Sequence, residues 1–292
     1  MKMMDWMVAV VCYFAFTSII QSEEPIITKR NIEYGRVEGH ALKLDLYLPH
    51  ENTPPPLIVW VHGGAWRRGS KDGMPLKSMV ERGWAVASVD YRLTPVASFP
   101  AQIHDIKAAI RFLRAQAQHY RYLSDKIIIA GASAGGHLAA LVGTTNDHPT
   151  LEGSVGDYPD ESSSVQGILD FYGASNLTTI LQQSTPHGLG VRIPALQLLL
   201  GGPPEDRVPM ARLASPVYHV DSKDPPLMLI HGDQDPQMPI NQAHELQGAY
   251  QREELPVEFE VIHGAAHGGP EFYDYRRLRL ISAFLKKHLN LP

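Results

Sequence analysis

Cysteine is almost missing from this sequence. The 292 residues include one, Cys12, which lies close to the N-terminus. A chain with one cysteine forms no internal disulfide, so its fold has to be stabilised by a buried core, and the length is sufficient for one large domain. Lipidation of Cys12 is disfavoured, because the preceding Val11 is bulky where a lipoprotein signal has a small residue.

Clusters of basic residues and internal repeats are also missing. Lysine and arginine together number 26 against 31 aspartates and glutamates, which gives a formal net charge of -5. Such a chain has no positive field to attract a polyanion. We therefore expect no nucleic-acid partner.

The N-terminal apolar run is too short to span a bilayer comfortably. It extends from about Met7 to Ile20, follows Met1-Lys2 and precedes a polar stretch that includes Ser22. This pattern predicts a secretory signal peptide over residues 1–22, with an uncleaved membrane anchor as the alternative. Cleavage would release residues 23–292 as a secreted or periplasmic domain without a cysteine and without stable membrane association.

Strand and helix patterns alternate along the rest of the chain. The expected strands lie at about 42–48, 57–61, 84–89, 127–129, 165–171, 227–230 and 257–262, and the expected helices at about 75–82, 100–118, 136–143, 240–252 and 271–289. This alternation predicts one α/β domain with a mostly parallel central sheet and helices on both faces.

Two segments interrupt the alternation. Prolines and Gly201-Gly202 divide residues 177–226 into short pieces, which predicts a small helical lid insertion, because long insertions at the functional end of a sheet often cover active sites. Residues 144–164 are polar and include Asp157, Asp160 and Glu161. A solvated acidic loop is favoured there over a calcium site.

A strand, a sharp turn and a helix follow one another in the segment KIIIAGASAGGHLAALVG, residues 126–143. Ser133 lies at the apex of the turn, between Gly131 and Gly135. A serine in this G-x-S-x-G context is held in a strained conformation with its hydroxyl exposed above the sheet, and small neighbours let strand and helix approach. Ser133 is therefore the predicted nucleophile.

A serine nucleophile needs a base and an orienting acid on later loops at the same sheet edge. HGDQD at 231–235 supplies Asp233 and Asp235, and HGAAHGG at 263–269 supplies His263 and His267. The order serine, acid, histidine is typical of one hydrolase fold. His267 is favoured as the base because it lies deeper in its loop between small residues.

An oxyanion formed on ester attack needs fixed hydrogen-bond donors. The turn at Ser133 places the Ala134 N–H at that position, and the loop after the strand at 57–61 reads His62-Gly63-Gly64-Ala65. Gly64 and Ala65 are the favoured further donors, with Gly63 as a lesser candidate. The other reading of His-Gly-Gly is a simple turn at a strand end.

With these residues assembled, the chain resembles the α/β-hydrolase superfamily and, within it, the hormone-sensitive-lipase-like esterases. HGGAW, VDYRLTP and GASAGGH carry this resemblance. It is closer to the feruloyl-esterase-like (BD-FAE) carbohydrate esterases, through FPAQIHDIKAAIRFLR, LLGGPPEDRVPMARLASPVYHV and DPPLMLIHGDQDPQMPI. The family pattern puts the acid four residues after the histidine of His-Gly, which selects Asp235. Ala65 and Met238 depart from it, where a glycine and a valine are more usual.

The resemblance implies a serine esterase that needs no metal or cofactor and acts on acetyl or feruloyl esters of plant polysaccharides. Its catalytic residues would be Ser133, Asp235 and His267. Trp66 either forms part of the substrate pocket or packs in the core. The alternatives are an arylformamidase or broad small-ester carboxylesterase and, from another class, a non-catalytic ligand receptor, which would commonly lack one member of the triad.

Overall fold

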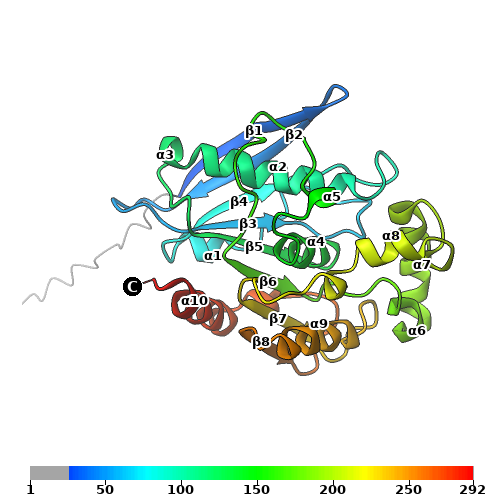
Figure 1. The fold of residues 1–292 in the computed structure, drawn as a ribbon. Coiled ribbons are helices and arrows are strands. Elements are labelled where there is room, and N and C mark those ends of the chain that lie inside the picture. Colours follow the sequence, from blue (N-terminus) through cyan, green and yellow to red (C-terminus); the bar gives the residue numbers. More distant parts are fainter. Residues whose placement is uncertain (1–25, 292) are drawn as a thin grey trace, which may run out of the picture.

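The central element is an eight-stranded sheet, which the computed structural model shows within the described residues 26–291. The predicted signal peptide lies outside the described residues. The strand order is β1-β2-β4-β3-β5-β6-β7-β8, and β2 is antiparallel to both of its neighbours while the remaining pairs are parallel. The strands are β1 (Ile27–Val37), β2 (His40–Leu48), β3 (Leu57–Val61), β4 (Ala85–Val89), β5 (Ile127–Ala132), β6 (Gly167–Phe171), β7 (Leu227–Gly232) and β8 (Val257–Ile262) (Figure 1).

Strand β1 is an addition to the predicted elements. It forms an antiparallel hairpin with β2, and its register shifts twice, between Lys29 and Ile32 and between Glu33 and Gly35. The first five residues of β1 are exposed, and no alternation of polar and apolar residues marks them in the sequence. The two shifts break the period of two on which strand prediction depends.

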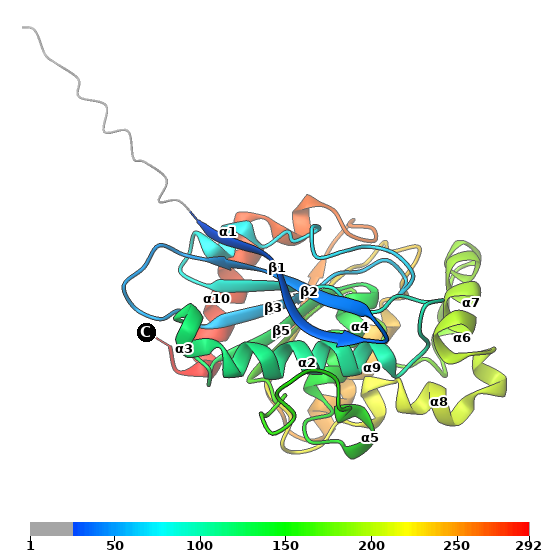
Figure 2. The same cartoon turned by 90° about the horizontal axis from the view of Figure 1, so that it is seen from above.

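Helices cover both faces of the sheet, as predicted (Figure 2). One face carries α2 (Ala101–Ala115), α3 (Ala117–Tyr120), α4 (Ala134–Gly143) and α9 (Asn241–Arg252), whose apolar residues join one core cluster. The other face carries α1 (Lys77–Val80) and α10 (Tyr275–Leu289), which join a second cluster. The short α5 (Pro149–Glu152) precedes β6. This covering on two sides explains the unbroken apolar runs of the central strands.

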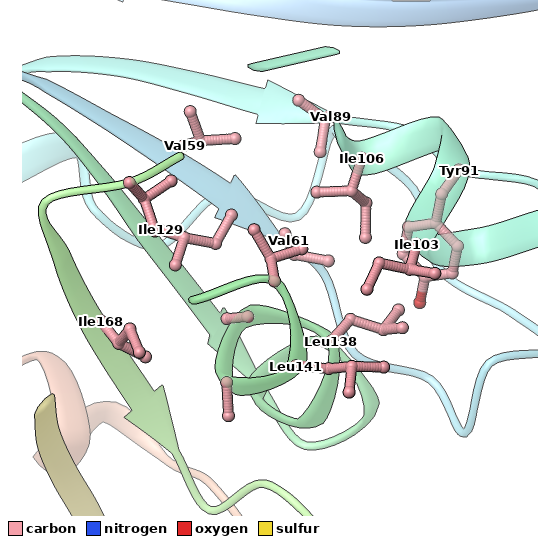
Figure 3. Close-up of a cluster of buried hydrophobic side chains, with 14 of the residues drawn as sticks. Val59, Val61, Val89, Tyr91, Ile103, Ile106, Ile129, Leu138, Leu141 and Ile168 are labelled. Atoms are coloured by element: carbon pink, nitrogen blue, oxygen red, sulfur yellow. The ribbon is translucent and has the colours of Figure 1, made fainter. Parts of the chain in front are cut away.

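Strand β3 shows how the two core clusters divide the sheet. Val59 and Val61 belong to the cluster under α2 and α4, whereas Ile58 and Trp60 belong to the cluster under α10, because successive side chains of a strand point to opposite faces. Figure 3 shows Val61 near Ile106 of α2 and Leu138 of α4, and Val59 near Ile129 of β5. Ser133 directly follows β5, which pairs with β3 in the middle of the sheet.

The segment predicted as a lid contains α6 (Ile180–Gln183), α7 (Pro186–Leu200), η1 (Pro204–Asp206), α8 (Val208–Leu213) and η2 (Pro216–Tyr218). Helices α6, α7 and α8 gather beyond the carboxyl ends of the central strands (Figure 1). A covering role for this segment stays a prediction.

The bounds of several predicted helices shift in the structure, and two of these changes have a clear form. The helix expected at 100–118 is divided into α2 and α3. The helix expected from residue 271 begins at Tyr275, because the Asp274 carboxylate caps it by accepting a hydrogen bond from the Arg277 N–H, and the short helix η3 (Pro270–Tyr273) precedes the cap.

Residues 26–291 can also be examined for membrane-spanning helices and for groups of side chains that could bind a metal ion. None of the helices described there combines the length and the apolar character needed to cross a bilayer. No group of three or more histidine, cysteine, aspartate and glutamate side chains in this range is arranged to hold a metal ion, including the acidic residues Asp157, Asp160 and Glu161.

Candidate active site

Ser133 lies on the sharp turn between β5 and α4, as the pattern predicted. Its backbone has φ 56° and ψ -118°, a strained region for a residue with a side chain. A Cβ on Gly131 would lie 2.2 Å from the Gly135 carbonyl oxygen, and one on Gly135 would lie 2.1 Å from the Val61 carbonyl oxygen. Both positions therefore require glycine, and their close contacts hold the serine in this conformation.

The structure brings Ser133, His267 and Asp235 into one chain of hydrogen bonds. The Ser133 hydroxyl lies 2.8 Å from His267 Nε2, and His267 Nδ1 lies 2.6 Å from Asp235 Oδ2. With its Nδ1–H donated to the carboxylate, the neutral ring leaves Nε2 free to accept the serine proton. The three residues lie on the loops that follow the carboxyl ends of β5, β7 and β8.

Asp235 is held as a buried carboxylate. Its Oδ1 accepts hydrogen bonds of 2.8 Å from the backbone N–H groups of Gln237 and Met238, and His231 Nε2 lies 3.4 Å from its Oδ2. Burial alone would raise the pKa of Asp235, but the hydrogen bonds from His231, His267 and the backbone lower it well below its usual value. The side chain therefore stays negative and orients His267.

The two rejected candidates pair with each other. His263 Nδ1 lies 2.8 Å from Asp233 Oδ2, and the other oxygen of Asp233 accepts a hydrogen bond from the Gly264 N–H. The His263 side chain is 86% exposed. Asp233 and His263 thus form a surface contact between the same two loops that hold Asp235 and His267 below them.

The predicted oxyanion loop lies against the Ser133 turn. A Cβ on Gly63 would lie 2.7 Å from the Ala132 carbonyl oxygen, and the backbone at Gly64 and Ala65 has positive φ values of 111° and 53°. Ala134 is the first residue of α4, so its N–H has no acceptor within the helix. The backbone amides of both segments are thus close to the nucleophile, and their donor roles stay predictions.

Two residues of VDYRLTP support the oxyanion loop, a contact that sequence reasoning did not predict. The Tyr91 hydroxyl donates a 3.0 Å hydrogen bond to the His62 carbonyl oxygen, and the two rings stack at 4.5 Å. The Thr94 N–H donates a 2.8 Å bond to the Trp66 carbonyl oxygen. VDYRLTP follows β4, the strand that pairs with β3, so its position in the sequence could have indicated that it contacts the loop after β3.

A cavity of about 370 Å³ opens at Ser133. The cavity is lined by the oxyanion loop, the Ser133 turn, His267, helix α7 and several aromatic side chains. The lining residues are Trp60, Gly63, Gly64, Ala65, Arg68, Gly73, Pro75, Ala132, Ser133, Tyr172, Val191, Arg192, Gln237, His267 and Tyr273. A larger cavity of about 670 Å³ lies between β1 and residues 154–158 and contains none of the candidate residues. The cavity at Ser133 is therefore the candidate substrate site.

The structure does not place Trp66 in this cavity. The indole is fully buried, and its Nε1–H donates a 3.1 Å hydrogen bond to His137 Nδ1, while His137 Nε2 lies 2.6 Å from the Ala214 carbonyl oxygen. The pocket role considered for Trp66 is therefore wrong, and the residue packs in the core beneath the oxyanion loop. Trp60, Tyr172 and Tyr273 line the cavity instead.

Comparison with models of known protein families shows the family to which this chain belongs. A family model described as BD-FAE matches residues 44–250, which include Ser133 and Asp235. The chain belongs to the BD-FAE family. The resemblance stated from the sequence motifs is thereby confirmed.

Individual curated proteins are also similar to this chain. The chain is 32% identical to the esterase LipC of Mycobacterium tuberculosis over 251 residues, which cover 83% of this chain and 60% of LipC. It is 34% identical to the kynurenine formamidase of Danio rerio over 122 residues, which cover 41% of this chain and 40% of that protein. This BD-FAE chain therefore spans less than two thirds of the length of either relative.

A solved structure extends the likeness to the fold. The truncated form of a carbohydrate esterase from gut microbiota is similar with a TM-score of 0.80 and 29% sequence identity, covering 91% of this chain and 98% of that one. The predicted α/β-hydrolase fold is confirmed.

Proposed function

We propose that this BD-FAE protein is a serine carboxylic-ester hydrolase. The observation that carries the proposal is the hydrogen-bonded chain from Ser133 through His267 to the buried Asp235. The strained turn supplies an exposed hydroxyl, and the negative acid holds the histidine in the tautomer that accepts a proton. The esterase named among the relatives supports the same chemistry.

The first half of the proposed reaction forms an acyl-enzyme. The Ser133 oxygen attacks the ester carbonyl carbon while His267 Nε2 takes the serine proton. The resulting oxyanion is stabilised by the amides of Ala134, Gly64 and Ala65. The bond to the alcohol oxygen then breaks, and His267 returns its proton to that oxygen so that the neutral alcohol leaves.

The second half releases the acid. Water attacks the carbonyl carbon of the acyl-enzyme while His267 Nε2 takes a proton from it, and the same amides stabilise the second oxyanion. The Ser133 oxygen then leaves as a hydroxyl after receiving the proton back. Asp235 stays ionised through both halves because its two oxygens are hydrogen-bonded in the folded protein.

The proposed substrates are acetyl or feruloyl esters of plant polysaccharides. Support comes from membership of the BD-FAE family and from the similarity to a carbohydrate esterase. The predicted signal peptide over residues 1–22 supports a secreted or periplasmic location, where such polymers are accessible. The intact mass of protein recovered from the exported fraction tests this location, and a chain that begins near Glu23 is the expected result.

Labelling by a fluorophosphonate tests the catalytic assignment. We expect the reagent to modify Ser133 in the parent protein and to leave the Ser133→Ala variant unmodified, because only an activated serine reacts readily. A parent protein that remains unlabelled would support the non-catalytic receptor instead.

A formamidase is the second candidate function, and the similarity to a kynurenine formamidase favours it. The same serine, histidine and acid would attack a formamide carbonyl in place of an ester carbonyl. Rates on N-formylkynurenine, methyl ferulate and acetylated xylan separate the two functions. We expect kcat/KM to be higher for the esters, and a clear preference for N-formylkynurenine would assign the protein as a formamidase.

A further inference from the structure

Arg192 of helix α7 lines the Ser133 cavity as a buried cation without a carboxylate partner. The residue is 4% exposed. Its Nη2 donates a hydrogen bond to the Gln237 carbonyl oxygen, whereas its Nε is buried with no acceptor. Within the described residues, Asp235 acts on this guanidinium through space and without a hydrogen bond to it. A buried charge that is only partly hydrogen-bonded is costly, so this group is poised to receive an acceptor.

The rest of the cavity lining carries no acidic side chain. Arg68, an exposed residue that follows the oxyanion loop, contributes a second guanidinium. The indole Nε1–H of Trp60 is a further buried donor without an acceptor. The residues that line the cavity with Ser133 therefore combine positive charge with buried donors that have no acceptor.

The nearest negative charge is already committed to other partners. Asp235 influences Arg192 through space, but its two oxygens accept hydrogen bonds from His267, Gln237 and Met238. Burial lowers the pKa of Arg192 to about 10, which still leaves the guanidinium protonated at neutral pH. The positive charge is therefore present at neutral pH, and Asp235 acts on it without a hydrogen bond.

From these contacts we infer that Arg192, assisted by Arg68, binds a carboxylate on the substrate, so that the enzyme prefers esters with an anionic acyl or alcohol part. A planar guanidinium offers parallel N–H groups that match the two oxygens of a carboxylate, whereas a sugar hydroxyl would leave the charge uncompensated. This inference rests on the proposed ester hydrolysis and specifies its substrate class.

Matched pairs of esters test the inference and locate the carboxylate. On the alcohol side the pair is 4-acetoxybenzoate and 4-acetoxybenzamide, and on the acyl side it is methyl 4-carboxybenzoate and methyl 4-carbamoylbenzoate. The members of each pair have nearly the same shape, and they differ in a carboxylate that is replaced by a neutral carboxamide. We expect kcat/KM for the anionic ester of at least one pair to exceed that of its neutral partner by about 10- to 100-fold.

Variants assign the preference to the guanidinium. Arg192→Met should bring the anionic-to-neutral ratio of kcat/KM close to one, mainly through KM, while Arg192→Lys should retain part of it. The control is Arg207→Met, which removes an exposed arginine of the same insertion outside the cavity and should leave the ratio unchanged. The use of a ratio cancels any general loss caused by breaking the contact with Gln237.

A binding measurement gives an answer that does not depend on turnover. Calorimetry on the Ser133→Ala protein should show that terephthalate binds more tightly than terephthalamide, and Arg192→Met in that background should abolish the difference. Equal binding of both, or hydrolysis of neutral esters with no anionic preference, would overturn the inference and leave the proposed function intact. Absence of fluorophosphonate labelling together with a retained preference in binding would instead overturn the proposed function alone.

Discussion

At the scale of single residues, the site is defined by which of two similar pairs reaches Ser133. Each of the loops after β7 and β8 carries two candidates, and the structure sorts them into a buried pair and an exposed pair. The buried pair ends on the nucleophile, 2.8 Å from its oxygen, whereas the exposed pair closes on itself. The two pairs therefore provide an internal control for the proposed chemistry.

Removal of the orienting acid should reduce catalysis without unfolding the protein. Asp235→Asn removes the negative charge that holds the Nδ1–H tautomer of His267, so we expect kcat on 4-nitrophenyl acetate to fall by about 10³- to 10⁴-fold. Asp233→Asn is the matched control and should retain nearly full activity. Equal losses in the two variants would contradict the assignment of Asp235.

Removal of the nucleophile should be at least as severe. Ser133→Ala leaves the oxyanion donors and the cavity in place but removes the atom that attacks, so kcat on the same ester should fall by several orders of magnitude, on the order of 10⁵ or more. Steady-state kinetics with a circular dichroism check of folding measure this effect. A variant with parental turnover would exclude Ser133 from the mechanism.

At the scale of elements, the turn between β5 and α4 depends on backbones that almost touch. The carbonyl oxygen of Val61, at the end of β3, occupies the space where a side chain on Gly135 would begin. Helix α7 offers the opposite case, because a Cβ on Gly190 would meet no atom within 4 Å. The same substitution should therefore have opposite effects at the two positions.

Alanine at these two glycines tests the packing of the turn. Gly135→Ala must displace β3 or α4 and should destabilise the protein by about 1–3 kcal/mol, with a loss of activity. Gly190→Ala in the interior of α7 should stabilise the fold by about 0.4–1 kcal/mol, because alanine has less freedom to lose on folding. Chemical denaturation measures both changes, and a neutral Gly135→Ala variant would refute the close contact.

At the scale of the whole molecule, stability is coupled to pH through a buried acid that the proposed reaction does not use. Asp170 at the end of β6 is 2% exposed and accepts a 2.8 Å hydrogen bond from the Gly173 N–H. Burial raises its pKa to about 7, opposed by the nearby His231 and by that hydrogen bond. The folded protein therefore binds a proton at Asp170 that the unfolded chain releases near pH 4.

The direction of the pH effect follows from this difference in proton binding. As pH rises from about 4 to about 7 the folded state holds more protons than the unfolded state, so the contribution of Asp170 to the free energy of unfolding decreases and levels off above about 7. Between pH 5 and pH 8 the parent protein should lose on the order of 2 kcal/mol relative to Asp170→Asn.

Denaturation curves at the two pH values measure this loss. Asp160→Asn, which removes one exposed carboxylate, controls for the change in net charge. A constant difference in stability between parent and Asp170→Asn at both values would contradict the raised pKa.

The features that depend on local pattern could be predicted from the amino-acid sequence. Alternation of strands and helices predicted the mostly parallel sheet, because apolar period and turn residues act over a few positions. Ser133 was predicted because the turn needs small neighbours on both sides, and the strand ends predicted which loops would carry the acid and the base. Choosing Asp235 also required the family pattern, since spacing within one loop does not show which carboxylate is buried.

The features that depend on the packing of distant segments became visible in the folded structure. Strand β1 has no alternating pattern and is defined by its pairing with β2. Trp66 is buried in the core, where its indole N–H donates a hydrogen bond to His137. Arg192 reaches the cavity because α7 packs on the loop that contains Gln237. Burial and pairing depend on residues far away along the chain, so the residue types alone could not specify which arginine or tryptophan would line the cavity.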